Sequence, residues 1–262
     1  MHITSPQNPK IKNLVKLRRR RHRDRQRRML IDGGRALRLA LQNNVPLETL
    51  YFVPEQADAG VLALARRQNV PLQPVSPAVF QKIGYGDNPD GLLGVAPQPP
   101  LRLQDLPAPP RRPLYLIAEG LEKPGNIGAI LRSADAAGAS ALILCDCRTD
   151  VYNPNVIHAS RGAFFTVPVA VATAADALLW LRERNVPIFA AAPDADATPF
   201  TRAVLRPPVA IAVGAEHRGL TEVWLRHPRL RIPMFGQVDS LNVAQAAPLL
   251  LFEAVRQREA TP

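Results

Sequence analysis

Short apolar segments alternate along this chain with segments of helical periodicity, and this alternation restricts the fold more than any other feature. In the first part of the chain, a strand-like run at residues 47–53 precedes a helix-like run at residues 59–69. After residue 113, the strand-like runs LYLIAEG, ALILCD and VAIAVGAE are apolar at nearly every position. Such strands are covered on both faces, as in a parallel sheet between helices. We therefore predict an α/β chain whose second half forms a mostly parallel sheet.

The alternation is interrupted at residues 97–113, where seven of seventeen residues are proline. Proline at this density favours an extended, semi-rigid spacer. A chain of 262 residues is also long enough for two domains. We therefore predict a smaller α/β domain at residues 1–96, a linker at residues 97–113 and a second domain at residues 114–262.

Neither a membrane segment nor a metal site is visible in the sequence. No apolar run approaches the roughly 20 residues that span a membrane, and the first residues lack the apolar core of a signal peptide. The two cysteines, Cys145 and Cys147, are too few for a disulfide framework or a zinc site. We expect a cytoplasmic protein with no membrane partner and no metal, in which both cysteines are buried as small residues.

Positive charge is concentrated at one end of the chain. Residues 1–38 contain thirteen Lys and Arg and two acids, and their net charge of +11 equals that of the whole chain. Within this segment Ile11, Leu14, Val15 and Leu17 recur near helical spacing, followed by RRRRHRDRQRR. This pattern predicts a helix with an apolar stripe and an Arg-rich face, suited to the phosphates of a polyanion. The alternative is a solvated, disordered tail. The candidate phosphate contacts are Lys10, Lys12, Lys16, Arg18, Arg19, Arg20, Arg21 and Arg23.

Three loops that follow strand-like runs carry glycine and small polar residues. The loop GLEKPGNIG leads into a helix that holds Asn126 and Arg132, and the segment IPMFGQVDSLNVAQAA holds Ser240 and Asn242. Asn126 and Arg132 are six residues apart, about 240° around a helix, so one helix start presents both only if Asn126 is its cap. The plainer interpretation is that these residues are ordinary helix caps and a surface arginine. Ligands of open α/β sheets bind at the carboxyl ends of strands, so we interpret these loops as one site.

The third loop, AVGAEHRGL, places Gly214, Glu216 and Gly219 directly after a buried strand. Glycine at such a turn lets the backbone approach a ligand closely or adopt a positive φ. The sequence contains neither the G-x-G-x-x-G pattern nor a phosphate-binding G-x-x-x-x-G-K-S/T loop. It also lacks the G-x-S-x-G turn of ester hydrolases. Binding of nucleotides through either of the first two motifs is therefore unsupported.

As a set, NIGAILRSADAAG, AVGAEHRGL and IPMFGQVDSLNVAQAA resemble the three signature motifs of the SpoU (TrmH-type) RNA ribose methyltransferases of the SPOUT superfamily. The resemblance covers about residues 113–260. In addition, SPQNPKIKNLVKLRRRR followed by LIDGGRALRLAL resembles the RNA-binding domain, similar to a ribosomal protein fold, that precedes the catalytic domain in several members. Thiostrepton-resistance methyltransferases share this layout.

The resemblance implies a C-terminal trefoil knot, S-adenosylmethionine as methyl donor and a homodimer with active sites near the subunit interface. It implies methylation of the ribose 2′-hydroxyl of structured RNA, with ribosomal RNA preferred and transfer RNA as a second candidate. The basic residues of the first segment then become RNA-binding residues. A non-catalytic RNA-binding protein would also explain the basic segment, and an α/β enzyme that acts on a small molecule would also explain the sheet.

Carried over by position, the resemblance also implies site residues. The implied catalytic residues are Asn126, Arg132, Glu216, Ser240 and Asn242. The implied cofactor contacts are Gly214, Glu216, Gly219, Ile232, Met234, Ser240, Leu241 and Asn242. The sequence departs from the family pattern at Asp32, where Glu is common, and at Pro248, which predicts a kink in the last helix.

Arginine is essentially never neutral in proteins, so we do not expect Arg132 to act as a simple base. We expect its guanidinium to stabilise the developing 2′-alkoxide, while Ser240 or an RNA phosphate oxygen helps to carry the proton away. Asn126 would orient Arg132 or the ribose.

Overall fold

The computed structural model describes residues 2–85, 90–206, 208–215 and 218–259. The chain divides into two compact units. Unit 1 contains Met1–Pro99 together with Asp150–Thr166, and unit 2 contains Pro100–Thr149 together with Val167–Pro262. The segment Asp150–Thr166 therefore packs with unit 1 although both of its neighbours in sequence belong to unit 2.

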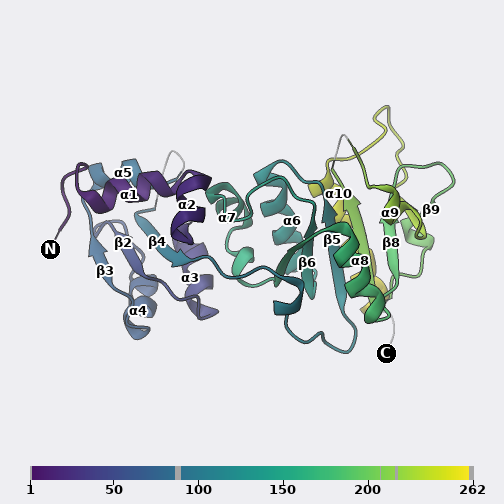
Figure 1. Cartoon of the computed structure of the whole chain (residues 1–262), viewed down its shortest axis with the longest axis horizontal. Helices are drawn as coiled ribbons and strands as arrows, with labels where there is room; N and C mark the ends of the chain where they lie inside the picture. Colours follow the sequence, from purple (N-terminus) through teal and green to yellow (C-terminus); the bar gives the residue numbers. More distant parts are fainter. Residues whose placement is uncertain (1, 86–89, 207, 216–217, 260–262) are drawn as a thin grey trace. The chain divides into compact units, whose positions relative to one another are not determined.

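Unit 1 is a four-stranded sheet with helices, and its elements can be followed in Figure 1. The strand order is β1-β4-β2-β3, with β1 and β2 antiparallel to β4 and β3 parallel to β2. The strands are β1 (Arg28–Asp32), β2 (Thr49–Phe52), β3 (Leu72–Pro74) and β4 (Leu92–Pro97). The helices are α1 (Pro9–Leu17), α2 (Arg20–Gln26), α3 (Gly34–Gln42), α4 (Ala59–Arg67), α5 (Pro77–Ile83), α7 (Pro154–Ser160) and the short 3-10 helix η2 (Ala163–Phe165).

The basic segment at the start of unit 1 is folded and docks through its apolar residues. Ile11, Leu14 and Leu17 are buried in a core cluster with residues of α5, β1 and β4, whereas Val15 is 42% exposed. The prediction of one helix is wrong, because α1 ends at Leu17 and α2 begins at Arg20. Arg19, between them, has extended backbone angles. The apolar stripe therefore holds α1 in place, and the arginine run continues into a second helix.

Unit 2 is built on a seven-stranded sheet in the order β7-β6-β5-β10-β8-β11-β9, in which every described strand pairing is parallel. The predicted α/β fold with a mostly parallel sheet is thus confirmed. The strands are β5 (Leu114–Glu119), β6 (Ala141–Cys145), β7 (Val169–Ala172), β8 (Ile188–Ala191), β9 (Thr198–Pro199), β10 (Val209–Gly214) and β11 (Arg229–Arg231). The helices are η1 (Leu103–Asp105), α6 (Pro124–Ala136), α8 (Ala174–Glu183), η3 (Phe200–Arg202), α9 (Glu222–Leu225) and α10 (Val243–Glu259).

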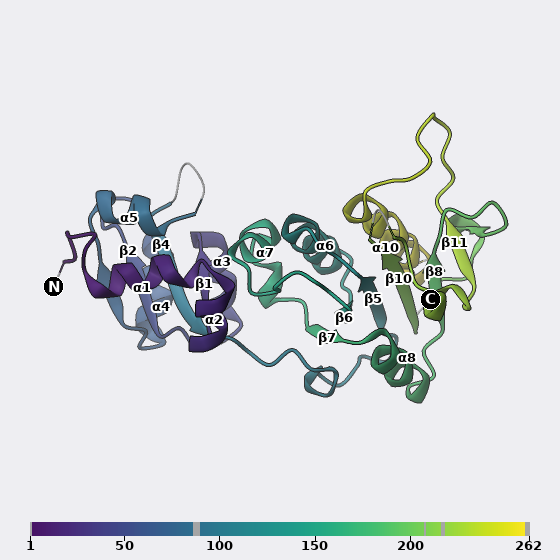
Figure 2. The ribbon, with the colours of Figure 1, turned by 45° about the horizontal axis from the view of Figure 1, so that its top comes forward.

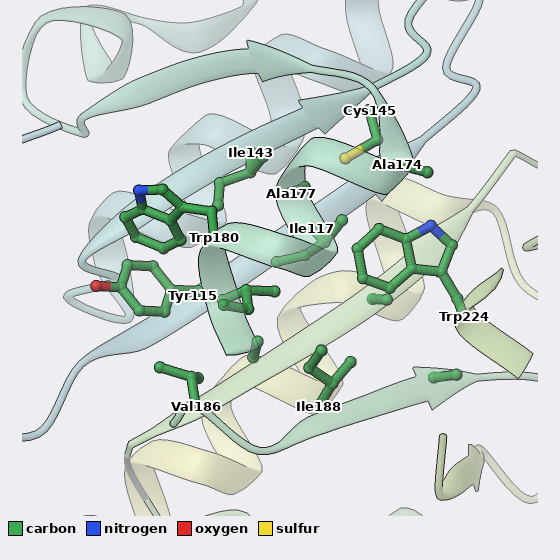
Figure 3. Packing of buried hydrophobic residues seen from close by; sticks show 14 of the residues in the cluster. Tyr115, Ile117, Ile143, Cys145, Ala174, Ala177, Trp180, Val186, Ile188 and Trp224 are labelled. Carbon is green, nitrogen blue, oxygen red and sulfur yellow. The ribbon is translucent and has the colours of Figure 1, made fainter. Parts of the chain in front are cut away.

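Helices cover the sheet of unit 2 on both faces. On one face, α8 and α9 pack over the central strands in a buried cluster in which the rings of Trp180 and Tyr115 pack edge to face. Figure 3 shows this cluster, with Trp180 beside Tyr115 and Trp224 on the opposite side of the view. On the other face, α10 packs against α6 and against β5 and β10 (Figure 2). This double cover explains why the strands are apolar at nearly every position.

The last helix, α10, contains Pro248, and it continues past this residue to Glu259. A proline inside a helix lacks the N–H that would bond to the carbonyl four residues earlier.

No helix in the described part of the chain is long and apolar enough to cross a membrane.

Candidate active site

A pocket of about 490 Å³ lies in unit 2 at the carboxyl ends of the three neighbouring parallel strands β8, β10 and β11. We call it the strand-edge pocket. Its lining comes from residues 191–194 after β8, residues 213–215 and 218–220 at the end of β10, residues 225, 230, 232 and 234 around β11, and residues 239–241, 243 and 246 at the start of α10. Loops of an open parallel sheet place their ligands at this edge, as the sequence pattern predicts.

Six of the predicted cofactor contacts meet around the strand-edge pocket, namely Gly214, Gly219, Ile232, Met234, Ser240 and Leu241. Three other predicted site residues, Asn126, Arg132 and Asn242, are not among the described residues that line it. Glu216 lies outside the described residues. The structure thus brings together the second and third motifs at one pocket, while the first motif contributes no lining residue among those described.

The turn after β10 needs glycine at Gly214 because two backbone segments meet there. A Cβ atom at Gly214 would lie 2.2 Å from the carbonyl carbon of Gly219 and 2.5 Å from the amide nitrogen of Leu220. The N–H of Gly219 donates to the carbonyl oxygen of Ala215 at 2.8 Å, and Gly219 has a φ of +62°. Glycine adopts this conformation at little cost. Both glycines line the pocket, so a ligand there would meet backbone.

A buried carboxylate at the end of β5 fixes the chain that follows this turn. Glu119 is only 3% exposed, and its Oε2 accepts a hydrogen bond from the N–H of Thr221 at 2.7 Å. Its Oε1 accepts from the hydroxyl of Thr221 at 2.8 Å and from the indole N–H of Trp224 at 2.9 Å. Leu220 and Leu225 on either side line the strand-edge pocket. Glu119 therefore positions this wall of the pocket, a role that the sequence pattern did not reveal.

Ser240 and Asn242, the two polar residues before α10, have different roles in the structure. The side-chain oxygen of Asn242 accepts from the N–H of Ala244 at 2.8 Å, and the Asn242 carbonyl accepts from the N–H groups of Gln245 and Ala246. Asn242 therefore caps the helix. Ser240 is exposed, lines the strand-edge pocket, and donates to the carboxylate of Asp239 at 3.4 Å. Ser240 is thus the residue of this pair that lines the pocket.

The first motif differs from its predicted geometry at Asn126. Helix α6 begins at Pro124 and Lys123 occupies the cap position, so the prediction that Asn126 caps the helix is wrong. Proline is well suited to the first helical position, and this moves the helix start two residues before Asn126. Asn126 and Arg132 therefore both lie within α6, on directions about 120° apart around its axis. Asn126 is half-buried and Arg132 is exposed.

Charges on the wall of the strand-edge pocket are partly compensated. Asp194, which lines the pocket, accepts from Arg229 at 2.6 Å, and Arg229 also bonds Asp196 at 2.5 Å. The hydrogen bond to Asp194 and the charge of Asp196 raise the pKa of Arg229 above its usual value. Asp239 and Arg218 are the other charged lining residues that the structure describes.

The predicted RNA-binding residues of unit 1 differ in how available they are. Lys10, Lys12, Lys16, Arg18, Arg19, Arg20 and Arg21 are exposed. Arg18 also donates to the carbonyl oxygen of Gly84, and Arg20 pairs with Asp24 at 3.4 Å. The exposed positions leave a dense cationic surface on α1 and α2.

Arg23 is different from its neighbours, because it is only 1% exposed. Its guanidinium donates to the carbonyl oxygens of Leu17 and Arg18 at 2.8 Å and 2.6 Å and forms an ion pair with Asp150. A buried arginine of this kind needs such partners. The prediction that Arg23 contacts RNA is wrong, since its side chain instead joins α2 to the segment that begins at Asp150.

The two thiols have different surroundings. Cys145 is fully buried, and burial raises the pKa of its thiol. Cys147 is half-buried, not buried as predicted, and its thiol lies 3.3 Å from the carbonyl oxygen of Leu121.

The described residues contain no group of three or more His, Cys, Asp or Glu that could hold a metal ion.

Comparison with known proteins gives two family matches that together span most of the chain. Residues 113–252 match the SpoU rRNA Methylase family, and residues 8–94 match the MRM3-like substrate binding domain. The 23S rRNA (uridine(2479)-2′-O)-methyltransferase of Streptomyces viridochromogenes is 32% identical over 251 residues, which are 91% of this chain and 86% of that protein.

Solved structures resemble the whole chain. The crystal structure of an RNA 2′-O ribose methyltransferase is 45% identical with a TM-score of 0.85, and the match covers 98% of this chain and 99% of that one. The AdoMet-bound rRNA methyltransferase from Sinorhizobium meliloti is 31% identical with a TM-score of 0.87, covering 98% of this chain and 97% of that one.

Proposed function

Because the chain belongs to the SpoU rRNA methylase family, we propose that it methylates the ribose 2′-hydroxyl of ribosomal RNA with S-adenosylmethionine as methyl donor. The observation that carries this proposal is the strand-edge pocket, where the second and third motifs meet at the carboxyl ends of parallel strands. The names of similar proteins support ribosomal RNA over transfer RNA, since they include a 23S rRNA 2′-O-methyltransferase and an AdoMet-bound rRNA methyltransferase.

The strand-edge pocket is large enough to hold the methyl donor. Its volume of about 490 Å³ lies within the range of roughly 300–1,000 Å³ that is common for small-molecule sites. We propose that the backbone of Gly214, Ile232, Met234 and Leu241 holds the cofactor, and that Gly219 and Ser240 complete the contact. When bound, S-adenosylmethionine supplies an electrophilic methyl group on a positively charged sulfur.

The protein must align the ribose oxygen and manage its proton and charge. We propose that the guanidinium of Arg132 stabilises the negative charge that develops on the 2′-oxygen, because arginine stays protonated. A phosphate oxygen of the RNA then takes the proton, either directly or through the hydroxyl of Ser240, which gives up its own proton as it accepts that of the ribose. We propose that Asn126 orients Arg132 or the ribose. Glu216 and Asn242 complete the proposed catalytic set, with Asn242 holding the start of α10.

We propose that the chain acts as a homodimer. Arg132 is exposed and is not among the described residues that line the strand-edge pocket of its own chain, so a second copy offers a way to complete the site. Large apolar side chains of unit 2 are also exposed, among them Phe235 at 96%, Val238 at 62%, Leu249 at 42% and Phe252 at 47%. Phe235 and Val238 lie in the same connection as Ser240, next to the pocket. Exposed apolar groups of this kind are typical of subunit interfaces.

Three further parts of the proposal concern the chain as a whole. We propose that the C-terminal domain contains a trefoil knot, because membership of the SpoU family implies one. We propose that residues 1–96, together with the segment Asp150–Thr166 of unit 1, recognise RNA. Residues 97–113 link the domains, and the rest of residues 114–262 carries catalysis. Action on ribosomal RNA supports a cytoplasmic protein.

The test is transfer of a labelled methyl group from S-adenosylmethionine to separated pools of deproteinised ribosomal RNA and transfer RNA. We expect label in ribosomal RNA, mapped to a 2′-O-methylated nucleotide. Arg132→Ala and Arg132→Lys should both lose most activity, while Arg182→Lys, an exposed arginine of α8, should keep it. Near-normal turnover by Arg132→Lys would exclude a role for the planar guanidinium. A chain that binds RNA but not S-adenosylmethionine would instead be a non-catalytic RNA-binding protein.

A further inference from the structure

A second pocket, of about 260 Å³, lies within unit 1. We call it the Asp32 pocket. Three separate segments line it, with Asp32, Gly33, Arg35 and Ala36 from the end of β1 and the start of α3, Tyr85 and Asp90 from the connection between α5 and β4, and His158 and Arg161 from the end of α7. We infer that the Asp32 pocket binds one unpaired nucleotide of the RNA substrate, an inference that rests on the proposed function.

Two carboxylates fix the walls of the Asp32 pocket. The side chain of Asp32 accepts from the N–H of Tyr85 at 2.9 Å, and the side chain of Asp90 accepts from the N–H of Gly34 at 2.6 Å. These bonds tie the end of β1 and the start of α3 to the segment around Tyr85. The Asp90 carboxylate also occupies the N-terminus of α3, so a phosphate would have to bind elsewhere in the pocket.

An aromatic surface stands on one side of the Asp32 pocket. The rings of Tyr85 and His158 lie 5.2 Å apart between centroids, with an interplanar angle of 50°. Tyr85 is half-buried and His158 is exposed, so these rings can meet a ligand that enters from solvent. Proteins commonly hold unpaired RNA bases by stacking them on Tyr or His side chains.

The polar groups of the Asp32 pocket suit the phosphate of a nucleotide and the polar edge of its base. Arg35 and Arg161 are exposed, and a guanidinium binds phosphate through paired N–H groups. Asp32 is only 7% exposed, and burial raises the pKa of its carboxyl group to about 7. Near neutral pH this group therefore exists in both forms, and it can donate to or accept from the edge of a base.

The size of the Asp32 pocket favours one base over a larger ligand. Its volume of about 260 Å³ is just below the range of roughly 300–1,000 Å³ of sites that enclose whole small molecules. A metal ion is a poorer match, because each carboxylate already accepts a backbone N–H and two arginines share the lining. The aromatic rings match the face of a base, the buried carboxyl group matches its polar edge, and the exposed guanidinium groups match the phosphate.

The test uses the full chain and 23S rRNA transcribed with 4-thiouridine or 6-thioguanosine. After irradiation, cross-linked peptides are mapped by mass spectrometry, and RNA affinity is measured by filter binding. We expect cross-links at Tyr85 or His158. We expect Tyr85→Ala to weaken RNA binding roughly ten-fold, as for loss of a stacked base, and Arg35→Ala to weaken it through loss of a phosphate contact. Tyr85→Phe should keep the affinity, because a purely stacking contact does not need the hydroxyl.

The matched control is Arg67→Ala, which removes an exposed arginine of α4 that is not among the described residues lining the pocket. Its RNA affinity should stay within two-fold of wild type, and all variants should bind S-adenosylmethionine normally. If Tyr85→Ala and Arg35→Ala bind RNA as Arg67→Ala does, the inference is overturned, whatever the cross-links show. Methyl transfer by wild type would then leave the proposed function intact. Conversely, a wild type that transfers no methyl group but loses RNA affinity on Tyr85→Ala would retain the nucleotide pocket and refute the proposed function.

Discussion

Replacement of the buried carboxylate of Glu119 tests how the wall of the strand-edge pocket is held. In Glu119→Gln the new NH₂ group must face either the N–H of Thr221 or the indole N–H of Trp224, because both donors point at the carboxylate. One buried N–H is then left without an acceptor, which costs about 1–3 kcal/mol. Glu119→Ala leaves both N–H groups unpaired, and we expect a loss of roughly 2–6 kcal/mol.

Tryptophan fluorescence of the full chain reports these losses of stability for unit 2, because both tryptophans of the chain, Trp180 and Trp224, belong to unit 2. Urea unfolding followed by tryptophan fluorescence should show a midpoint for Glu119→Gln that is lower by roughly 1 M. Titration calorimetry should show weaker binding of S-adenosylmethionine, because the neighbouring residues Leu220 and Leu225 line the pocket.

The matched control is Glu122→Gln, three residues further along the chain, where the carboxylate is 55% exposed and pairs with Arg148 at 3.4 Å. An exposed pair of this kind contributes about 0–1 kcal/mol, so this variant should unfold close to wild type. If Glu119→Gln and Glu122→Gln have the same midpoint and the same affinity for S-adenosylmethionine, then Glu119 does not hold the wall of the pocket.

Three further predictions concern stability, the turn after β10 and RNA affinity. The pKa of Asp32 is raised to about 7, so between about pH 4 and pH 7 the folded state keeps a proton that the unfolded state has lost, and the free energy of unfolding falls as pH rises. Asp32→Asn should therefore be more stable than wild type above pH 7 but not at pH 4, with a difference of up to about 1.4 kcal/mol per pH unit; parallel urea midpoints across this range would contradict this. Gly214→Ala should abolish binding of S-adenosylmethionine, because the new Cβ would overlap backbone, whereas Gly125→Ala, where a Cβ meets nothing within 4 Å, should bind normally; equal calorimetric affinities would disprove this. Arg19→Ala combined with Arg21→Ala should weaken RNA binding and reduce the slope of log affinity against log salt by about 2; an unchanged slope would show that these arginines do not contact phosphate.

The sequence predicts the layers of the fold because each strand and helix follows from local pattern. The apolar runs at the positions of β5, β6 and β10 indicate strands covered on both faces, and none of these strands lies at the edge of the sheet. The burial of Ile11 and Leu14 follows in the same way from helical spacing. Such features depend on residues close together in the chain, and their periodicity is visible without tertiary contacts.

Features that depend on distant partners could not be predicted. Arg23 looks like any other arginine in a basic run, and only its contact with Asp150, 127 residues later, separates it from them. Glu119 is likewise defined by Thr221 and Trp224, which are 102 and 105 residues away. The one local sign that the side chain of Glu119 is buried is its position, an acidic residue at the end of an otherwise apolar strand.

The start of α6 and the presence of α7 both have local signals in the sequence. Pro124 stands two residues before Asn126, and proline at the first helical position would have placed the start of α6 correctly. Helix α7 was not predicted, although Asn153 caps it and Pro154 follows at its first position. Asparagine followed by proline is a known start signal for a helix.

The central claim is that the strand-edge pocket of unit 2 holds the methyl donor. A crystal structure of this chain with S-adenosylmethionine tests the claim most directly. We predict that the nucleoside lies against Gly214, Ile232 and Leu241, at the carboxyl ends of β10 and β11. Density for the nucleoside at any other place on the chain, or crystals without it and no binding heat in solution, would contradict this account.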